Sequence, residues 1–289
     1  MKRGFFKFVI LFFLSVSSLF GESSVWKISD AKHTMYLGGT IHLLRSSDYP
    51  LPSEFDKAYS QADYVVFETD LARTQSELFA AMLAQKMILP LGQTLANKLT
   101  SKTYAELTSY LASQRYTIRM FDRLEPWAAV LTLTQLKLAQ MGMDQSGVDM
   151  HYSRRALSDH LPQRYLETIA EQIDIITGIG AGEEDVMILQ ALHDMKQLDS
   201  MIPWMVEEWR QGKTARLERE LVQDMKNESP KMYQHILKQR NDRWKPKLIA
   251  MMQEDKIGFV LIGAMHLLGE DGLLEQFRML GYQVELFKE

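Results

Sequence analysis

The chain of 289 residues contains no cysteine, which excludes several kinds of site before any motif is considered. Disulfide bonds, thiolate metal ligands and a cysteine nucleophile all require that residue. Basic residues are also not in excess, because 33 lysines and arginines stand against 37 acidic residues and give a net charge of −4. Since proteins that bind nucleic acid usually carry a basic surface, we expect no nucleic-acid partner.

The sequence also lacks the short motifs that identify several large enzyme classes. It has no P-loop, no dinucleotide-binding Gly-x-Gly-x-x-Gly, no Gly-x-Ser-x-Gly and no His-Glu-x-x-His. These absences count against nucleotide-binding, serine-hydrolase and zincin-type activities. What the chain does have is 46% hydrophobic residues, enough for a substantial core without disulfides.

The amino-terminal residues have the composition of a secretory signal peptide. Basic residues precede an apolar run at 8–14, and a serine-rich stretch follows it up to Gly21. The apolar run is shorter than the ~20 residues that a membrane-spanning helix needs. We therefore separate residues 1–21 from a single domain at 22–289 and predict an exported protein, periplasmic or secreted. An uncleaved amino-terminal membrane anchor is the competing interpretation.

Strand patterns occur at both ends of the chain, and helical patterns fill the middle. From about 74 to 253, apolar residues recur mostly at three- and four-residue spacing, as they do in helices. The predicted strands are 25–29, 34–38, 63–70, 161–168, 256–264 and the final stretch "YQVELF". Because strands and helices alternate in this way, we predict an α/β (α+β) domain. Its central mixed sheet would combine amino- and carboxyl-terminal strands, with a large helical insertion at about 74–253.

One motif occurs twice, more than two hundred positions apart. "YLGGTIHLL" at 36–44 and "FVLIGAMHLL" at 259–268 each end an apolar run in Gly-x-x-His-Leu-Leu. His42 and His266 therefore each follow a predicted strand, and Glu68 ends another. Because functional side chains in α/β sheets gather beyond the carboxyl ends of strands, we expect these three residues to meet.

Two imidazoles and one carboxylate suit a divalent ion of the first transition row, such as Mn²⁺, Co²⁺ or Zn²⁺. The predicted metal ligands are His42, Glu68 and His266, and the ion would activate a bound water. Asp70 shares a face with Glu68 if the strand continues, which suggests a supporting role. Each residue also has a structural interpretation, because a histidine after a strand is more often a loop or core residue.

Four further stretches, taken together with the two Gly-x-x-His motifs and Glu68, make the sequence resemble the TraB/PrgY/GumN family. These stretches are "EPWAAVLTL" (125–133), "SGVDMHYSRRA" (146–156), "YLETIAEQIDII" (165–176) and "QRNDRW" (239–244). The resemblance covers roughly residues 25–287. The family includes the Tiki Wnt-inactivating proteases and is distantly similar to erythromycin esterases and ChaN haem-binding proteins. It therefore implies a Tiki/erythromycin-esterase/ChaN-like fold.

The resemblance also implies roles for particular residues. His42, Glu68 and His266 match the metal-binding or catalytic set of the family. Arg240 matches an arginine able to pair with a site carboxylate or a substrate oxyanion. The implied supporting residues are Asp149, Glu167 and Asn241, in addition to Asp70 from the strand pattern. The family usually has glutamate where this chain has Gln239, so no acid role is carried over to that position.

We accordingly predict a metal-dependent hydrolase, a peptidase of the Tiki type, in which a metal-bound water attacks a carbonyl. Its partner would be a peptide or small-molecule substrate, with membrane contact only through an uncleaved amino-terminal segment. Two alternatives stay open. One is a non-catalytic haem-, metal- or peptide-binding protein that uses the same histidines. The other is a metal-independent, esterase-like hydrolase with one histidine as general base.

Overall fold

The structure, a computed structural model, describes residues 23–288. The predicted leader at 1–21 lies outside the described residues. Among residues 23–288, no helix combines the length and the apolar character needed to cross a membrane.

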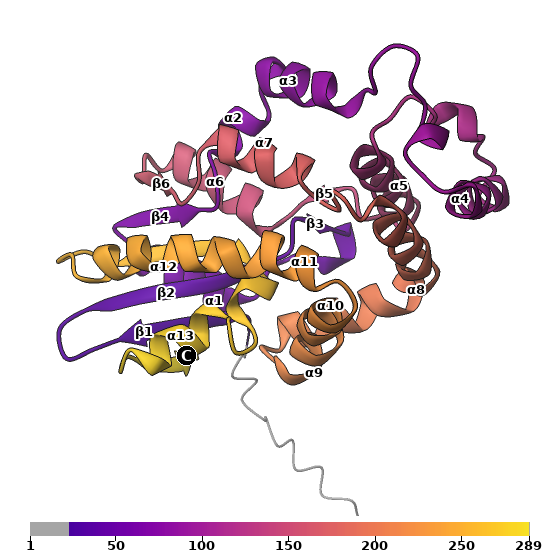
Figure 1. Cartoon of the computed structure of the whole chain (residues 1–289). Helices are drawn as coiled ribbons and strands as arrows, with labels where there is room; N and C mark the ends of the chain where they lie inside the picture. Colours follow the sequence, from indigo (N-terminus) through magenta and orange to yellow (C-terminus); the bar gives the residue numbers. More distant parts are fainter. Residues whose placement is uncertain (1–22, 289) are drawn as a thin grey trace, which may run out of the picture.

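A six-stranded mixed sheet forms the centre of the fold (Figure 1). Across the sheet the strands are β6 (Gln163–Tyr165), β4 (Tyr64–Phe67), β7 (Gly258–Gly263), β2 (Thr34–Thr40), β1 (Val25–Ser29) and β8 (Gln283–Leu286). From β6 to β2 each strand is parallel to its neighbour, whereas β1 pairs antiparallel with both β2 and β8. The predicted fold class is confirmed, because strands from both ends of the chain build this sheet.

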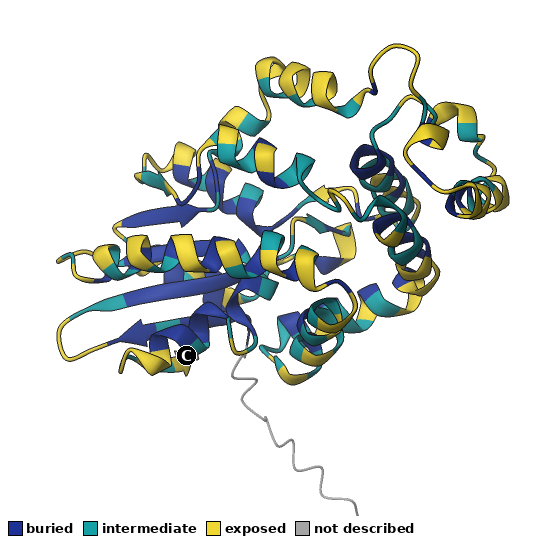
Figure 2. Cartoon of the chain, viewed as in Figure 1, coloured by how far each residue is buried: buried dark blue, intermediate teal, exposed yellow. Residues whose placement is uncertain are grey.

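Helices cover both faces of the sheet, which explains why its central strands are buried along almost their whole length (Figure 2). On one face lie α1 (Ser53–Gln61) and α6 (Val148–Ser158). The ring of Phe55 on α1 lies 6.2 Å from that of Tyr152 on α6 and 6.2 Å from that of Phe259 on β7. These aromatic contacts fix both helices against the same part of the sheet.

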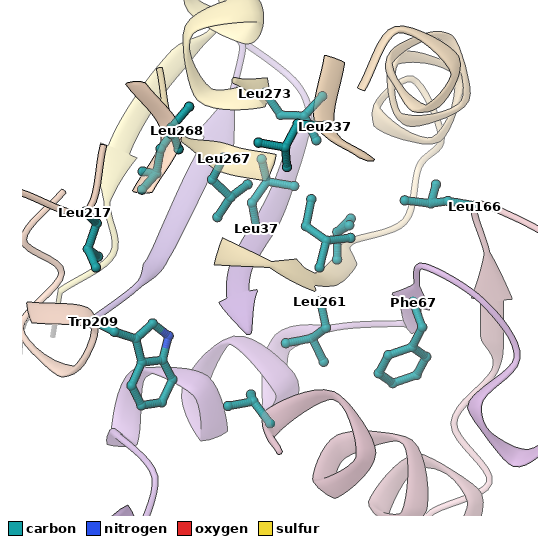
Figure 3. Packing of buried hydrophobic residues seen from close by; sticks show 14 of the residues in the cluster. Leu37, Phe67, Leu166, Trp209, Leu217, Leu237, Leu261, Leu267, Leu268 and Leu273 are labelled. Carbon is teal, nitrogen blue, oxygen red and sulfur yellow. The ribbon is translucent and has the colours of Figure 1, made fainter. Parts of the chain in front are cut away.

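The opposite face is covered by α12 (Gln239–Met252), α13 (Leu273–Met279) and the 3-10 turn η6 (Ala264–Leu267) (Figure 1). Leu267 belongs to the same buried cluster as Leu37 of β2 (Figure 3). The turn η6, which contains the second histidine motif, is therefore held against the sheet by apolar packing.

The segment between β4 and β7 is mostly helical, as predicted, although β6 within it joins the edge of the central sheet. Its remaining helices are α2 (Leu71–Thr74), α3 (Glu77–Met87), α4 (Ser101–Ser113), α5 (Pro126–Gln140), α7 (Ile169–Thr177), α8 (Glu184–Arg210), α9 (Ala215–Leu217), α10 (Asp224–Glu228) and α11 (Pro230–Tyr233). Short 3-10 turns are η1 (Ser46–Asp48), η2 (Leu95–Asn97) and η3 (Ile118–Met120), and π-helical turns are η4 (Glu218–Gln223) and η5 (Gln234–Lys238). The longest helix, α8, packs against α4 and α5.

A second, two-stranded pairing lies beyond the end of β2. It joins β3 (Leu43–Leu44) antiparallel to β5 (Gln145–Ser146). Because β3 directly follows His42 and β5 lies just before α6, the pairing brings the start of α6 against the loop after β2.

Candidate functional site

The carboxyl ends of three neighbouring strands, β2, β4 and β7, bring the predicted site residues together. Thr40 at the end of β2 is opposite Gly263 at the end of β7. A Cβ atom built on Gly263 would lie 3.3 Å from Glu68 Oε1 and 3.6 Å from His266 Cδ2. The same atom would lie 3.8 Å from His42 Nε2. The three side chains therefore surround Gly263, and a larger residue there would occupy the space between them.

His42 is the exposed member of the group, with 62% of its side chain open to solvent. Its Nδ1 lies 3.1 Å from Oδ2 of Asp149 on α6. Because a carboxylate can only accept, Nδ1 carries a proton, and in the neutral ring Nε2 keeps its lone pair. Nε2 has no hydrogen-bond partner among residues 23–288. Asp149 raises the pKa of His42 to about 9, although the water around the exposed ring screens this attraction.

A close approach of two backbone segments places Asp149 beside His42. The amide of Val148 donates to the carbonyl oxygen of Ile41 at 3.1 Å. A Cβ atom on Gly147 would lie only 2.1 Å from that oxygen, so the position requires glycine. In the sequence, the only sign of this contact is the Gly-x-Asp pattern of "SGVDM", from which the role of the glycine could not be inferred.

Arg240, the second residue of α12, is 6% exposed and joins two acidic strand ends. Its Nη2 donates to Glu68 Oε2 at 2.6 Å and to Glu167 Oε2 at 2.8 Å. Its Nε donates to Glu167 Oε1 at 2.9 Å. Its Nη1 donates to Nε2 of His266 at 3.1 Å. Four of the five N–H groups of the guanidinium thus have partners within the described residues, and one N–H on Nη1 remains available.

His266 is buried, with 4% of the residue exposed, and both of its ring nitrogens are engaged. Its Nδ1 lies 2.8 Å from Asn241 Oδ1. The amide nitrogen of Asn241 donates to the backbone oxygens of His266 at 3.0 Å and of Asp271 at 2.9 Å. Asn241 therefore accepts from Nδ1 and fixes the tautomer, and this leaves Nε2 to accept from Arg240.

Trp244 supports the same network, a role that the sequence did not indicate. Its Nε1 donates to Glu167 Oε1 at 3.0 Å. Its ring centroid lies 4.4 Å from the ring of His266 and 4.6 Å from Cζ of Arg240. Arg240 and Trp244 are four residues apart and so share one face of α12. That spacing in "QRNDRW" is the signal that could have identified the tryptophan.

The network sets the charges of its members. Burial disfavours the charged form of Glu68, but Arg240, helped by His266 and His42, outweighs it and holds the pKa of Glu68 well below its usual value. Burial would lower the pKa of Arg240, whereas Glu68 and Glu167 raise it, so the guanidinium stays charged. Burial lowers the pKa of His266 to about 3, and Arg240 adds to the effect, so this ring is neutral at pH 7.

The predicted metal ligands are close together, but Arg240 occupies two of them. It donates to Nε2 of His266 and to Oε2 of Glu68, which are atoms that an ion would need. A cation at this point would also meet the positive charge of the guanidinium. Across residues 23–288, no group of three or more histidine, aspartate or glutamate side chains is arranged to hold a metal ion. The donor set does not fit a metal ion in this arrangement, and bound Mn²⁺, Co²⁺ or Zn²⁺ stays a prediction.

The remaining supporting candidate, Asp70, is not brought to the site. The predicted strand at 63–70 ends at Phe67, so the shared face with Glu68 does not form. Asp70 instead caps α2, where its side chain accepts from the amide of Arg73 at 3.1 Å. The other supporting candidates, Asp149, Glu167 and Asn241, each contact one of the central residues directly.

A pocket of about 300 Å³ lies beside these residues. His42, Glu68, Arg240 and His266 line one end of it. Apolar side chains from α8, η4, η5 and η6 line much of the rest, among them Met205, Trp209, Leu221, Ile236, Leu237 and Met265. The arrangement offers one exposed base, one buried cation and an apolar cavity next to them.

Comparison with known proteins identifies the family to which the chain belongs. The sequence model of the TraB/PrgY/gumN family matches residues 24–286. The protein YbaP of Escherichia coli strain K12 is 23% identical over 270 residues, which cover 91% of this chain and 96% of that protein. YbaP of Shigella flexneri is 23% identical over 271 residues, with the same coverage. No solved structure matches. The chain thus belongs to the TraB/PrgY/gumN family, as its motifs predicted.

Proposed function

We propose that the protein is a hydrolase of acyl compounds in which His42 acts as the general base. The observation that carries the proposal is the contact between His42 Nδ1 and Asp149 Oδ2 at 3.1 Å. The carboxylate orients the ring and leaves Nε2 unpaired at the edge of the pocket. A histidine with an orienting carboxylate on one nitrogen and a free second nitrogen is a recurrent base in hydrolases.

In the proposed reaction, His42 Nε2 removes a proton from a water molecule whose oxygen attacks the carbonyl carbon of the substrate. The new C–O bond places negative charge on the carbonyl oxygen. The free N–H of Arg240 Nη1 donates to this oxygen and stabilises the charge. Asp149 stabilises the protonated imidazole. The bond to the leaving group then breaks, and His42 returns the proton to that group.

The other residues of the network position these groups. Glu167 and Trp244, which do not line the pocket, hold Arg240, and Glu68 holds its Nη2. Asn241 fixes His266, which in turn receives one N–H of Arg240 Nη1. The single remaining Nη1 N–H is therefore held in a fixed direction, which is the preorganisation that electrostatic stabilisation of a transition state requires.

Two substitutions test the role of His42. His42→Gln should lower kcat/KM for an acyl ester or peptide substrate about 100-fold or more, as expected for loss of a general base. Asp149→Asn should lower it as well, because the amide no longer favours the Nδ1–H tautomer. His193→Gln is the matched control, because this histidine lies exposed on α8 and does not line the pocket. Equal activity in His42→Gln and His193→Gln would rule the proposal out.

The pH profile gives a readout that a purely structural histidine would not move. A general base must be deprotonated, and Asp149 raises the pKa of His42 to about 9. Activity should therefore rise from pH 7 toward pH 9, with the active form lost as the pH falls below this pKa. In Asp149→Asn, the rise should move to lower pH because the attraction of the carboxylate is gone.

The metal-dependent peptidase predicted from the sequence is the second candidate. The close grouping of His42, Glu68 and His266 around Gly263 favours it. In this case, the guanidinium of Arg240 would have to leave Glu68 and His266 when the ion binds. Activity that a chelator abolishes and Mn²⁺, Co²⁺ or Zn²⁺ restores would support this candidate over the first.

Export is a further part of the proposal and is supported by the leader at 1–21 alone. The mass of the protein purified from its native host tests whether this segment is removed. Cell fractionation distinguishes a periplasmic or secreted protein from a membrane-anchored one.

A further inference from the structure

We infer that the pocket beside His42 binds an uncharged, apolar group attached to the acyl carbon of the ligand, such as an alkyl chain or an aliphatic side chain. The identity of this ligand as a substrate rests on the proposed hydrolase function.

Polar groups that a ligand could use are confined to one end of the pocket. Both carboxylate oxygens of Glu68 are bonded, to Arg240 and to the amide of Gly263, and both ring nitrogens of His266 are also bonded. Within the described residues, the side-chain polar atoms at this end that have no partner are Nε2 of His42, one N–H of Arg240 and the buried Oγ1 of Thr40. One carbonyl group, with its attacking water, uses the first two.

The wall of the pocket offers carbon surface. The only polar side-chain atom of Trp209, Nε1, donates to the carbonyl oxygen of Gly39 at 2.7 Å and is taken up by that bond. Leu221, Ile236 and Met265 line the pocket and are only half-buried, so part of their apolar surface stays open. An apolar ligand group would cover this surface, and its burial would drive binding.

The charges at the site disfavour an anionic ligand group. The positive charge of Arg240 is matched by the carboxylates of Glu68 and Glu167, which contact it at 2.6 and 2.8 Å. His42 lies 3.1 Å from the carboxylate of Asp149, so a negative charge already faces its ring. A carboxylate ligand would find no unpaired cation and would be repelled by the acidic side chains. An uncharged carbonyl compound meets no such cost, and a product carboxylate would be released.

The backbone of the wall has an unusual form that is common at binding sites. Leu221 lies in the π-helical turn η4, and Ile236 and Leu237 lie in the π-helical turn η5. Such turns are rare and often occur at functional sites. Two of them on the same wall support a ligand-binding role for this surface.

Binding without turnover tests the inference directly. Primary amides from butanamide to octanamide are titrated into full-length His42→Gln by isothermal titration calorimetry. Affinity should rise about 4-fold for each added methylene until the pocket is filled. Octanoate should bind about 10-fold more weakly than octanamide because of the carboxylates at the site. Affinity that does not depend on chain length, or that is higher for octanoate, would overturn the inference.

Two variants of the wall add a second test, made in the same His42→Gln background. Leu221→Gln and Ile236→Gln keep a long side chain but remove apolar surface, and each should weaken octanamide binding about 10-fold. Leu78→Gln is the matched control, because Leu78 lies on α3, is 71% exposed and does not line the pocket. Equal octanamide affinity in all three variants would place the binding surface elsewhere.

Hydrolysis assays with the wild-type chain show whether the acyl group comes from an ester or from a peptide. One arm uses p-nitrophenyl esters from acetyl to octanoyl, and the other uses peptides with alanine, leucine or phenylalanine on the acyl side. The series that is cleaved should show the same preference for larger apolar groups. Hydrolysis without this preference would refute the ligand class. Chain-length-dependent amide binding with no hydrolysis in either arm would refute the proposed function and leave the ligand class supported.

Discussion

Replacing Arg240 with methionine is expected to destabilise the fold by about 3–5 kcal/mol, because it leaves two buried carboxylates without their cation. The side chain of Glu167 is 1% exposed and that of Glu68 is 11% exposed. Arg240 donates three hydrogen bonds to these two groups, at distances between 2.6 and 2.9 Å. Methionine keeps much of the packing against Trp244, so the loss is mainly electrostatic.

The size of the effect follows from the number and burial of these bonds. A hydrogen bond to a charged group contributes about 1.5–3 kcal/mol. Uptake of a proton by one of the abandoned carboxylates recovers part of the loss. The remainder is the cost of breaking a buried ion pair by removing one partner.

A neighbouring arginine provides the control. Arg243 lies 3.6 Å from Glu167 Oε1, but its own side chain is 45% exposed. Arg243→Met should therefore cost less than about 1 kcal/mol, as exposed ion pairs do. Urea unfolding at pH 7, followed by tryptophan fluorescence, compares the two variants. If Arg240→Met lost no more stability than Arg243→Met, the buried network would not have the energetic role assigned to it.

The pH dependence of stability gives the same prediction a second readout. In the wild type the pKa of Glu68 is lowered, because Arg240 outweighs the effect of burial. A lowered carboxyl pKa contributes stability above the unfolded value of 4.5, and this contribution is lost as the pH falls below it. In Arg240→Met, burial is no longer opposed by the guanidinium and raises the carboxyl pKa. The variant should then gain stability as the pH falls from 7 toward 5, whereas the wild type should not.

Three further substitutions address individual contacts. Gly147→Ala should cost about 3 kcal/mol in thermal unfolding, since its Cβ would lie 2.1 Å from the oxygen of Ile41; an unchanged melting temperature would contradict this close approach. Gly263→Ala places a methyl group 3.3 Å from Glu68 Oε1. This variant should lose less than about 1.5 kcal/mol of stability but at least ~10-fold in kcat/KM. Wild-type kcat/KM in this variant would contradict the placement of the active site around Gly263. Asn241→Leu leaves a buried histidine and two carbonyl groups without partners and should cost about 2–3 kcal/mol in urea unfolding.

The elements that could be predicted from the sequence are those with a local signal. The apolar run before each Gly-x-x-His motif predicted a strand, and the two strands, β2 and β7, are parallel neighbours. The position of Glu68 after a β-branched run predicted its place at the same edge of the sheet. The pattern of helices between these strands was also visible, because it depends on spacing alone.

The environments of the two histidines could not be predicted, because they depend on elements distant in sequence. The motifs have equal spacing, yet in the sheet Gly39 is opposite Ile262 rather than Gly263. His42 then turns toward α6 and stays exposed, whereas His266 enters a 3-10 turn beneath α12 and is buried. Two similar motifs thus place their imidazoles in opposite environments.

The contacts of Arg240 also could not be predicted from the local sequence. Its pairing with a site carboxylate was among the predicted roles, but its bridge between Glu68 and Glu167 joins residues 172 and 73 positions away. Nothing in the local sequence indicates that the guanidinium also reaches His266. That contact decides which atoms of the site are free, and it changes the favoured mechanism from metal-bound water to a histidine base.

The central claim is that His42, oriented by Asp149, activates water without a bound metal ion. The most direct test is kcat/KM for the preferred acyl substrate at pH 9, measured on protein that elemental analysis has shown to be free of metal. We expect this protein to keep its activity and His42→Gln to lose at least ~100-fold. Loss of activity on metal removal, restored by added Mn²⁺, Co²⁺ or Zn²⁺, would contradict the claim.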